Sequence, residues 1–195
     1  MLTAMSDIWT AVLQEICPGM KGTRRKFFVD LADPEKRTGE DIARALELIM
    51  AFQKYFDVIL GLNEKEGYEI GVSLGLNTKD TSRDGLLGLC KQIYLHLRID
   101  TVVIHPTAYA LATGPDLTTY VEGPFTPRPK ITTGAGDHFN SGFCVGKLLG
   151  FPTDLCLLTG VATSGFYVRS GQSPTIADLA HTLRNWPPLE VTGGE

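Results

Sequence analysis

The sequence predicts an α/β fold in which helices cover a mostly parallel sheet. Three short apolar runs, at 27–31, 56–60 and 101–105, have the length and the β-branched or aromatic content of buried strands. Segments with helical spacing of apolar residues separate these runs, and such alternation favours parallel strands joined by right-handed crossovers. The chain has 195 residues, of which 43% are hydrophobic and 21% are charged, as in an ordinary globular domain. We therefore predict that residues 1–195 form a single α/β domain.

The first half of the chain is expected to contain four helices besides the three strands. Ser6 can cap a first helix, which a Pro-Gly pair ends. Thr38, with Asp41 three residues later, resembles a capping arrangement for a second helix. The apolar stripe of that second helix comprises Ile42, Ala45, Leu46, Ile49 and Phe52. The two other helices are expected to start within 61–66 and to span 82–97.

The second half is expected to contain a hairpin and then three helices. Residues 109–122 are predicted to form a hairpin at the edge of the sheet, because two short strand-like runs flank the turn residues Gly114-Pro115-Asp116. A first helix follows a glycine-rich turn at 134–136, and Pro152 suits the first turn of the next one. That next helix should be well buried, since its stripe comprises Leu155, Leu158, Ala162 and Phe166. Thr175 with Asp178 caps a last short helix, after which the tail is irregular.

Composition excludes several classes of function. The formal net charge of −4 argues against a nucleic-acid-binding surface. The four cysteines are widely scattered and form no Cys-x-x-Cys pair, which is typical of reduced thiols and not of a disulfide frame or a zinc site. No apolar run approaches membrane-spanning length, and the N-terminus lacks a signal-peptide pattern. We expect a soluble, cytoplasmic protein with neither a membrane nor a nucleic-acid partner.

One stretch, residues 131–143, carries the strongest chemical signal. In it Gly134, Ala135 and Gly136 precede Asp137, and an apolar pattern at helical spacing follows at once. In a tight turn that opens a helix, glycines let backbone N–H groups converge, and the helix dipole adds positive potential. Such a turn suits a phosphate in transfer, and Asp137 could accept a proton from an attacking hydroxyl. The structural alternative is that an aspartate in a first helical turn only interacts favourably with the dipole.

The longer string Thr-Thr-Gly-Ala-Gly-Asp, followed by Phe139, Gly142 and Phe143, resembles the C-terminal signature of the PfkB (ribokinase-like) carbohydrate kinases. The resemblance implies a ribokinase-like (Rossmann-like) three-layer α/β/α sandwich with a mostly parallel sheet. It also implies ATP-dependent phosphoryl transfer to a hydroxyl of a small-molecule sugar or nucleoside substrate. A dinucleotide-binding oxidoreductase is set aside, because no Gly-x-Gly-x-x-Gly turn follows an early strand.

The resemblance also assigns roles to individual residues of the turn. In the family this turn forms the anion hole, which corresponds here to Gly134, Ala135 and Gly136. The aspartate that matches Asp137 is the catalytic base in these kinases. Thr133, in the same string, is carried over as a nucleotide-binding residue.

Asn63 and Glu66 follow the end of a predicted strand, where ligands gather in open α/β sheets. This Asn-x-x-Glu pair resembles the family's second signature, in which the glutamate helps to organise magnesium near the phosphates through water. Mg²⁺ needs hard oxygen ligands and keeps several waters, so a carboxylate with an amide suits it. The resemblance thus implies ATP and Mg²⁺ as cofactors, with Glu66 at the metal and Asn63 at the nucleotide. Without the resemblance, Glu66 reads as a solvated residue at a helix start.

The sequence departs from the family pattern at three places in the nucleotide site. The usual Gly-x-x-Gly turn is replaced by Pro106-Thr107-Ala108-Tyr109, of which Thr107 still offers a hydroxyl to the nucleotide. Ile131 stands where the family often has an aspartate that helps to hold a monovalent cation, which makes that cation doubtful. Gly160 falls where an Asn or His often lies near the adenine. These departures leave open an alternative, a catalytically inactive pseudokinase or an association module.

The resemblance covers only the later part of a typical family member. The earlier part of these kinases holds the first strands of the sheet, much of the sugar pocket and a small β lid, so these N-terminal strands and the lid are expected to be missing here. A fragment of a longer protein, a start placed too late and a shortened homologue without activity all remain open. We expect an exposed sheet edge, through which a homo-oligomer could form.

Overall fold

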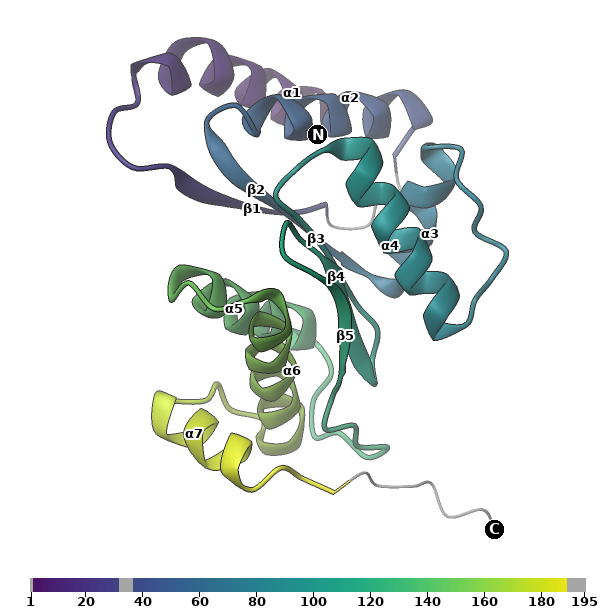
Figure 1. The fold of residues 1–195 in the computed structure, drawn as a ribbon, viewed down its shortest axis with the longest axis vertical. Helices are drawn as coiled ribbons and strands as arrows, with labels where there is room; N and C mark the ends of the chain where they lie inside the picture. Colours follow the sequence, from purple (N-terminus) through teal and green to yellow (C-terminus); the bar gives the residue numbers. More distant parts are fainter. Residues whose placement is uncertain (1, 32–36, 189–195) are drawn as a thin grey trace. The chain divides into compact units, whose positions relative to one another are not determined.

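The structure is a computed structural model that describes residues 2–31 and 37–188 (Figure 1). The chain divides into two compact units, each of which has helices and strands of its own. The first unit comprises Met1–Ile104 and Thr113–Pro115. The second unit comprises His105–Ala112 and Asp116–Glu195.

The first unit builds a parallel pair of strands and the helices that pack with it. Its helices are α1 (Leu2–Ala11), a π-helical turn (Val12–Ile16), a 3-10 turn (Cys17–Gly19), α2 (Gly39–Phe52), α3 (Glu64–Ser73) and α4 (Arg83–Leu97). Its strands are β1 (Arg25–Asp30), β2 (Phe56–Asn63) and β3 (Thr101–His105), of which β3 ends at the boundary between the units. The three strands are neighbours in that order, and β1 pairs with β2 in parallel register, with Arg25 opposite Phe56. The pairing of β1 with β2 confirms the predicted parallel arrangement for these two strands.

The start of the first helix differs from the prediction. Helix α1 already includes Leu2, so Ser6 lies inside the helix and does not cap it. The carbonyl oxygen of Ser6 instead accepts a hydrogen bond of 2.7 Å from the Thr10 hydroxyl. The residues before Ser6 include alanine, methionine and leucine, which favour helix, so nothing in the sequence stops the helix there.

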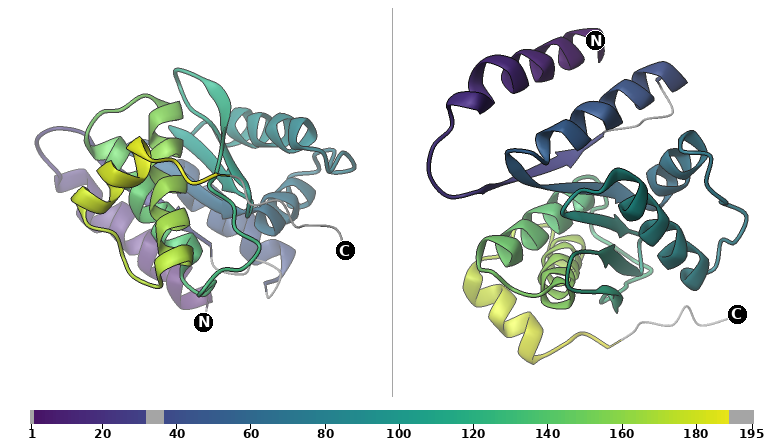
Figure 2. Two further views of the ribbon diagram at one scale, coloured as in Figure 1. Left: turned by 90° about the horizontal axis from the view of Figure 1, so that it is seen from below. Right: turned by 45° about the horizontal axis from the view of Figure 1, so that its top comes forward.

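Helix α2 is as predicted, both in its cap and in its buried face. The Asp41 amide donates to the Thr38 hydroxyl at 3.1 Å, and Glu40 and Asp41 place negative charge in the first turn. The predicted stripe is buried throughout, and Phe52 joins a cluster of aromatic rings with Phe27 at 4.7 Å and Trp9 at 6.1 Å. Figure 2 shows α1 running beside α2, where Trp9 makes this contact.

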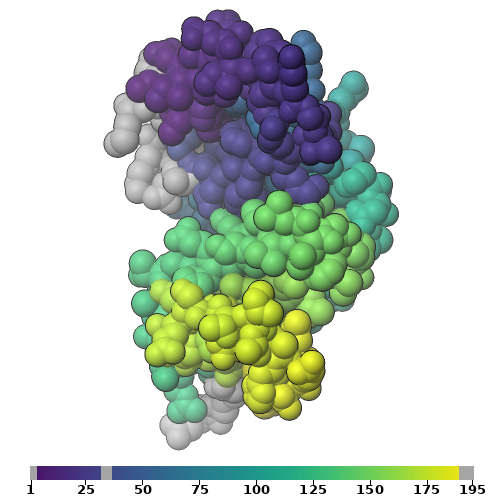
Figure 3. Space-filling model, turned by 90° about the vertical axis from the view of Figure 1, so that its left-hand side faces the viewer, coloured from purple at the N-terminus to yellow at the C-terminus, as the bar shows by residue number. Residues whose placement is uncertain are grey.

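The second unit contains a strand pair and three helices. Its elements are β4 (Tyr109–Thr113), whose last residue belongs to the first unit, β5 (Thr118–Glu122), α5 (Ala135–Leu148), α6 (Thr153–Ser170) and α7 (Ile176–Arg184). Strands β4 and β5 are neighbours joined by residues 114–117, as predicted for a hairpin. Thr175 and Asp178 form the predicted capping box of α7. Helix α7 is part of the yellow region in Figure 3, next to the green residues that precede it in the chain. Strands and helices therefore follow the predicted order in this unit as well.

Helices α5 and α6 pack closely because glycines line their contact. A Cβ atom added to Gly146 would lie 2.9 Å from the Cys156 Cα, and one added to Gly160 would lie 2.7 Å from the Phe139 ring. A Cβ atom added to Gly142 would collide with Thr163. The helix after Pro152 packs against α5, β5 and α7, so its burial is as predicted. The predicted stripe is not the buried part, since Ala162 is buried whereas Leu155 is 42% exposed.

Candidate functional site

The turn before α5 leaves backbone N–H groups without a side-chain cap. Gly134 is the N-cap residue and has φ +87°, a left-handed conformation that glycine adopts without strain. The first intrahelical hydrogen bond runs from the His138 amide to the Gly134 carbonyl, at 3.1 Å. The amides of Gly136 and Asp137 precede that bond and therefore have no intrahelical acceptor. The predicted tight turn that opens a helix is confirmed, and its N-terminus has the donors that bind anions.

The three predicted anion-hole amides are not equivalent. The Ala135 amide donates to the Thr132 carbonyl at 3.1 Å, inside the turn itself. The Gly136 backbone lies in the wall of a cavity, and a Cβ atom added to it would be 3.3 Å from His105 Cε1. Gly136 therefore faces the cavity directly, whereas the Ala135 amide would have to leave Thr132 before it could bind an anion.

Asp137 occupies the first turn of α5, as predicted, and its side chain is exposed. It follows Gly136 directly, so it lies one residue beyond the cavity wall. Among the described residues, no lysine, arginine or histidine forms an ion pair with it. The Asp137 carboxylate is therefore accessible from solvent.

The cavity next to the turn lies wholly within the second unit. Its volume is about 300 Å³, at the lower end of the range for small-molecule sites. Three groups of residues line it, from the end of β3 and the start of β4, from the segment that leads to the turn, and from α5 and α6. They are His105, Pro106, Thr107, Tyr109, Gly123, Pro124, Phe125, Thr126, Pro129, Thr132, Ala135, Gly136, Phe139, Val161, Ser164, Gly165 and Val168.

One wall of the cavity, residues 123–126, is held in place by a half-buried network of hydrogen bonds. The Arg169 guanidinium donates to the carbonyl of Phe125 at 2.8 Å and to that of Pro124 at 3.2 Å. The Gly123 amide donates to the Ala108 carbonyl at 2.8 Å. Gly165 of α6 lies against Pro124. A Cβ atom added to Gly165 would be 3.0 Å from the Pro124 Cδ atom, so a larger residue at position 165 would displace this wall. The cavity is thus shaped by fixed backbone.

The predicted nucleotide-binding residues are distributed unevenly around this cavity. Thr107 lines it, while Thr133 is exposed and its carbonyl accepts from the Tyr167 hydroxyl at 2.9 Å. Gly160 is buried against Phe139 behind the wall, which α6 forms with Val161 and Ser164. The site roles of all three residues stay predictions.

Sequence reasoning missed most of the α6 face of the cavity. This face consists of Val161, Ser164, Gly165 and Val168, which recur at the i, i+3, i+4 and i+7 spacing of one helical stripe. The same periodicity could have placed them together once Gly160 had been singled out. His105 was also missed, because an isolated histidine at a strand end carries no pattern.

Asn63 and Glu66, in the first unit, form a capping box at the start of α3. The Glu66 amide donates to Asn63 Oδ1 at 3.0 Å, and the Asn63 amide donates to Glu66 Oε2 at 2.8 Å. Glu66 is only 5% exposed, so the reading of it as a solvated residue is wrong. Both oxygens suit magnesium, and each already accepts one backbone N–H, so a metal held through water would not compete with the cap for these oxygens.

In the described part of the chain, no three or more His, Cys, Asp or Glu side chains gather as a ready-made metal site. Nor does any helix of that part have both the length and the apolar character needed to cross a membrane.

A family model matches almost the whole chain. The model describes prokaryotic ketohexokinase, and the match extends over residues 1–186. The chain belongs to the prokaryotic ketohexokinase family. Its similarity to a curated relative agrees with this: a ketohexokinase of Haloferax volcanii is 25% identical over 175 residues, which are 90% of this chain and 45% of the relative.

Solved structures of ribokinase-like proteins share the fold of this ketohexokinase-family chain. Ribokinase of Thermotoga maritima has a TM-score of 0.61 at 20% identity, over 88% of this chain and 52% of that one. Phosphofructokinase-2 of Escherichia coli has a TM-score of 0.64 at 17% identity, over 95% and 52%. Ribokinase of Cryptococcus neoformans, solved with ADP, has a TM-score of 0.64 at 19% identity, over 92% and 57%.

These matches confirm the predicted PfkB-type family and the predicted ribokinase-like α/β fold. The chain spans about half the length of the relatives it matches. This agrees with the prediction that the resemblance covers only one portion of a typical family member.

Proposed function

We propose that this chain is the nucleotide-binding and phosphoryl-transfer part of an ATP-dependent sugar kinase. The observation that carries the proposal is the uncapped N-terminus of α5, whose amides open beside a cavity of about 300 Å³ in the same unit. A helix start without its own cap is suited to bind the phosphoryl charge that develops during transfer. The family of the chain and the name of its Haloferax volcanii relative favour a ketohexose as the acceptor.

In this proposal the cavity binds the nucleotide. The apolar α6 face and the rigid 123–126 wall would hold the adenosine, and the Thr107 hydroxyl would contact it near the phosphates. Thr133 would contact the nucleotide where the turn begins, and Gly160 would support Phe139 from behind. The phosphates would then point at the amides of Gly134 and Gly136, with Ala135 joining them once its bond to Thr132 opens.

Asp137 is the proposed catalytic base. Its carboxylate is exposed in the first turn of α5, next to the amides that would hold the phosphoryl group. It would accept the proton of the acceptor hydroxyl as that oxygen forms its bond to phosphorus and the bond to ADP breaks. ATP would supply the phosphoryl group. Mg²⁺, when bound, would neutralise phosphate charge, and Glu66 with Asn63 are the residues proposed to order it through water.

The test compares the full chain with an Asp137→Asn variant. Phosphorylation of a panel of sugars that includes ketohexoses is measured with ATP and Mg²⁺. We expect the variant to lose about two to four orders of magnitude in rate, because it cannot accept the proton. Asp154→Asn is the matched control, since Asp154 also lies in the first turn of a helix, α6, of the second unit. Equal turnover by the wild-type chain and the Asp137 variant would overturn the proposal.

A non-catalytic nucleotide-binding protein is the second candidate. Two observations favour it: the Ala135 amide is engaged by Thr132, and Pro106 offers no N–H to a phosphate in the cavity wall. Calorimetry with ATP and Mg²⁺ separates the two functions. Binding of ATP without any sugar phosphorylation supports the second, whereas turnover that depends on Asp137 excludes it.

A further inference from the structure

Two aromatic side chains, His138 of α5 and Tyr167 of α6, are stacked against the turn that opens α5. Their ring centroids are 3.6 Å apart, and the ring planes differ by 12°. The Tyr167 hydroxyl donates to the Thr133 carbonyl at 2.9 Å, and His138 Nδ1 lies 2.7 Å from the Gly134 carbonyl oxygen. The other ring nitrogen of His138, Nε2, lies 2.9 Å from the Ser173 hydroxyl. The stacked pair therefore contacts two consecutive carbonyl groups of the turn.

The partners of His138 fix its tautomer. A carbonyl oxygen can only accept, so the Nδ1 atom beside Gly134 must carry a proton. In the neutral ring Nε2 then accepts from the Ser173 hydroxyl, and every polar atom of the ring has a partner. The ring is thus held on both edges, as well as by its stack on Tyr167.

The two carbonyl contacts decide where the neighbouring amides point. In a trans peptide unit the C=O group and the N–H group of the next residue point in opposite directions. Because Tyr167 holds the Thr133 carbonyl, the Gly134 N–H points away from Tyr167. Because His138 holds the Gly134 carbonyl through its ring and its own amide, the Ala135 N–H points away from His138, where Thr132 accepts it.

This arrangement differs from an ordinary helix cap. An N-cap side chain accepts hydrogen bonds from amides and so uses up the donors of the helix start. His138 and Tyr167 donate to carbonyls, so neither side chain uses up an amide, and of the two amides that they orient only that of Ala135 is bonded within the turn, to Thr132. They also prevent the peptide units next to Gly134 from turning over, which would direct a carbonyl oxygen at a bound anion. Glycine itself would allow that rotation.

We propose that His138 and Tyr167 are positioning residues, which hold the carbonyls of Thr133 and Gly134 so that neither carbonyl oxygen turns toward the transferred phosphoryl group and the Gly134 amide stays directed at it. The identity of this group rests on the proposed function, whereas the effect on the turn does not. Neither side chain lines the cavity, so neither is expected to contribute to binding of the adenosine.

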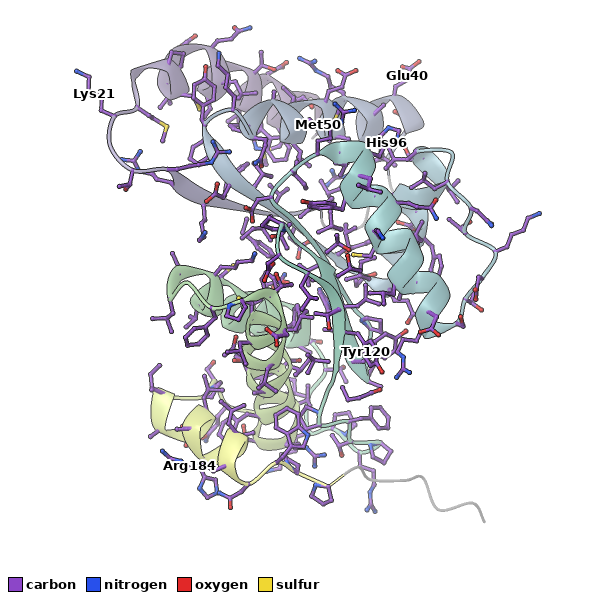
Figure 4. All side chains as sticks on the ribbon, viewed as in Figure 1. Lys21, Glu40, Met50, His96, Tyr120 and Arg184 are labelled. Carbon is purple, nitrogen blue, oxygen red and sulfur yellow. The ribbon has the colours of Figure 1, made fainter. Side chains whose placement is uncertain are left out.

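Three substitutions separate the contacts of the pair. Tyr167→Phe keeps the stacked ring and removes the donor to Thr133. His138→Asn keeps an amide nitrogen near the position of Nδ1, and with it the bond to Gly134. His138→Gln reaches the position of Nε2 and Ser173, but it has no donor at Nδ1. His96→Gln, on α4 in the first unit, is the matched control (Figure 4).

The kinetic test measures kcat and the KM for ATP in the full chain. We expect Tyr167→Phe and His138→Gln to lower kcat by about 10- to 100-fold, because the amides are misdirected when charge develops on the phosphoryl group. The KM for ATP should change by less than about threefold, since the cavity is untouched. His138→Asn and His96→Gln should retain the wild-type kcat. Equal losses in His138→Asn and His138→Gln, or no loss in Tyr167→Phe, would overturn the proposal.

Amide hydrogen exchange of residues 133–137 gives a second readout that needs no turnover. We expect faster exchange in Tyr167→Phe and His138→Gln than in the wild type, His138→Asn and His96→Gln, because the turn is no longer fixed. If the wild-type chain neither binds ATP nor phosphorylates a sugar, the proposed function fails, and exchange alone decides whether the pair positions the turn. Unchanged exchange in both variants refutes the positioning role.

Discussion

The N-termini of α3 and α5 were both predicted to bind the same ligand complex, yet they are built in opposite ways. At α3, Asn63 and Glu66 accept each other's backbone amides and close the helix start upon itself. At α5, Gly134 offers no side chain, and the nearby side chains hold carbonyls instead of amides. The first helix start is satisfied without a ligand, and the second keeps donors for one.

The other capped helices support this contrast. In α7, Thr175 and Asp178 form the same kind of box as in α3, and in α2 the Thr38 hydroxyl accepts from the third amide. Among the helices α2, α3, α5 and α7, the one without a side-chain cap is the one beside the cavity. The proposed anion site is thus the helix start at which the N-cap residue has no side chain and which lies next to a cavity.

The largest effect is expected when α5 is given an N-cap side chain, because this removes the difference between α5 and the capped helices. Gly134→Asp adds a carboxylate at the helix start, on the side of Tyr167, whose hydroxyl an added Cβ atom would approach to 3.3 Å. Its negative charge opposes the charge of a bound phosphoryl group, so we expect at least a 100-fold loss of ATP-dependent turnover, as for removal of an oxyanion-hole donor. Gly134→Asn is the control, because asparagine has the same size, carries no charge and tolerates a left-handed backbone better than most residues. Turnover that is equally low in both variants would assign the loss to backbone strain and not to charge.

Substitutions in the capping box of α3 are expected to have the next largest effect. They separate the two roles of Glu66, which are capping the helix and ordering magnesium. Glu66→Ala should lower the free energy of unfolding by about 0.5–2 kcal/mol, because it leaves the Asn63 amide without its buried acceptor. Glu66→Gln keeps an acceptor and should lose less. Urea unfolding of both variants measures this difference.

The same pair of variants tests the magnesium proposal in the sugar kinase assay. If Glu66 orders Mg²⁺ through water, Glu66→Gln should raise the Mg²⁺ concentration needed for half-maximal turnover while leaving stability nearly unchanged. An unaltered magnesium dependence in that variant would leave Glu66 with a capping role alone.

The cap of α7 in the second unit tests whether a capped helix start away from the cavity affects stability alone. Its expected effect on function is far smaller. Thr175→Ala should destabilise α7 by about 0.5–2 kcal/mol, since the hydroxyl that accepts from the Asp178 amide at 3.2 Å is removed. Affinity for ATP should not change, because α7 does not line the cavity. Calorimetry and thermal unfolding of one preparation check both statements, and a change in ATP affinity would contradict them.

The smallest effect concerns Asp116, which caps α6 from outside that helix. Its oxygens accept from the Thr153 amide at 3.1 Å and from the Thr153 hydroxyl at 2.5 Å. Burial alone would raise the pKa of Asp116, but the hydrogen bonds from Thr153 and the charge of Lys147 outweigh it and lower the pKa below its ordinary value. The folded state therefore binds this proton less readily than the unfolded state does.

The sign of the pH dependence follows from that difference. The stability that Asp116 contributes is fully present above its unfolded pKa of about 3.9 and is lost as the pH falls through the lower folded value. Asp116→Asn should thus be less stable than the wild type at pH 7, and the gap should narrow below about pH 4. Urea unfolding across this range measures the gap, and a constant difference would exclude the ionised carboxylate as its cause.

The sequence predicts local features of this molecule better than it predicts surfaces. Thr38 with Asp41, and Thr175 with Asp178, bond within one helical turn, so their spacing alone identifies them. The left-handed position of Gly134 is likewise a property of a short string. These interactions need no knowledge of the rest of the fold.

The cavity could not be predicted in this way because distant segments create it. Arg169 holds the carbonyls of Pro124 and Phe125 more than forty residues earlier in the chain, and Gly165 admits Pro124. Gly160 illustrates the error that results. Its neighbours on the helix line the cavity, but its own missing side chain makes room for Phe139. Only the direction in which α6 faces distinguishes these positions.

The glycine contacts between α5 and α6 have a consequence for protein engineering. Gly142 and Gly146 set how near the two helix axes lie, and Tyr167, which holds the turn, belongs to α6. If only the Thr-Thr-Gly-Ala-Gly-Asp sequence is transferred to another scaffold, the turn therefore lacks the α6 contacts that fix its conformation. The transplantable module is the helical hairpin 132–170, with its glycine seam and its tyrosine included.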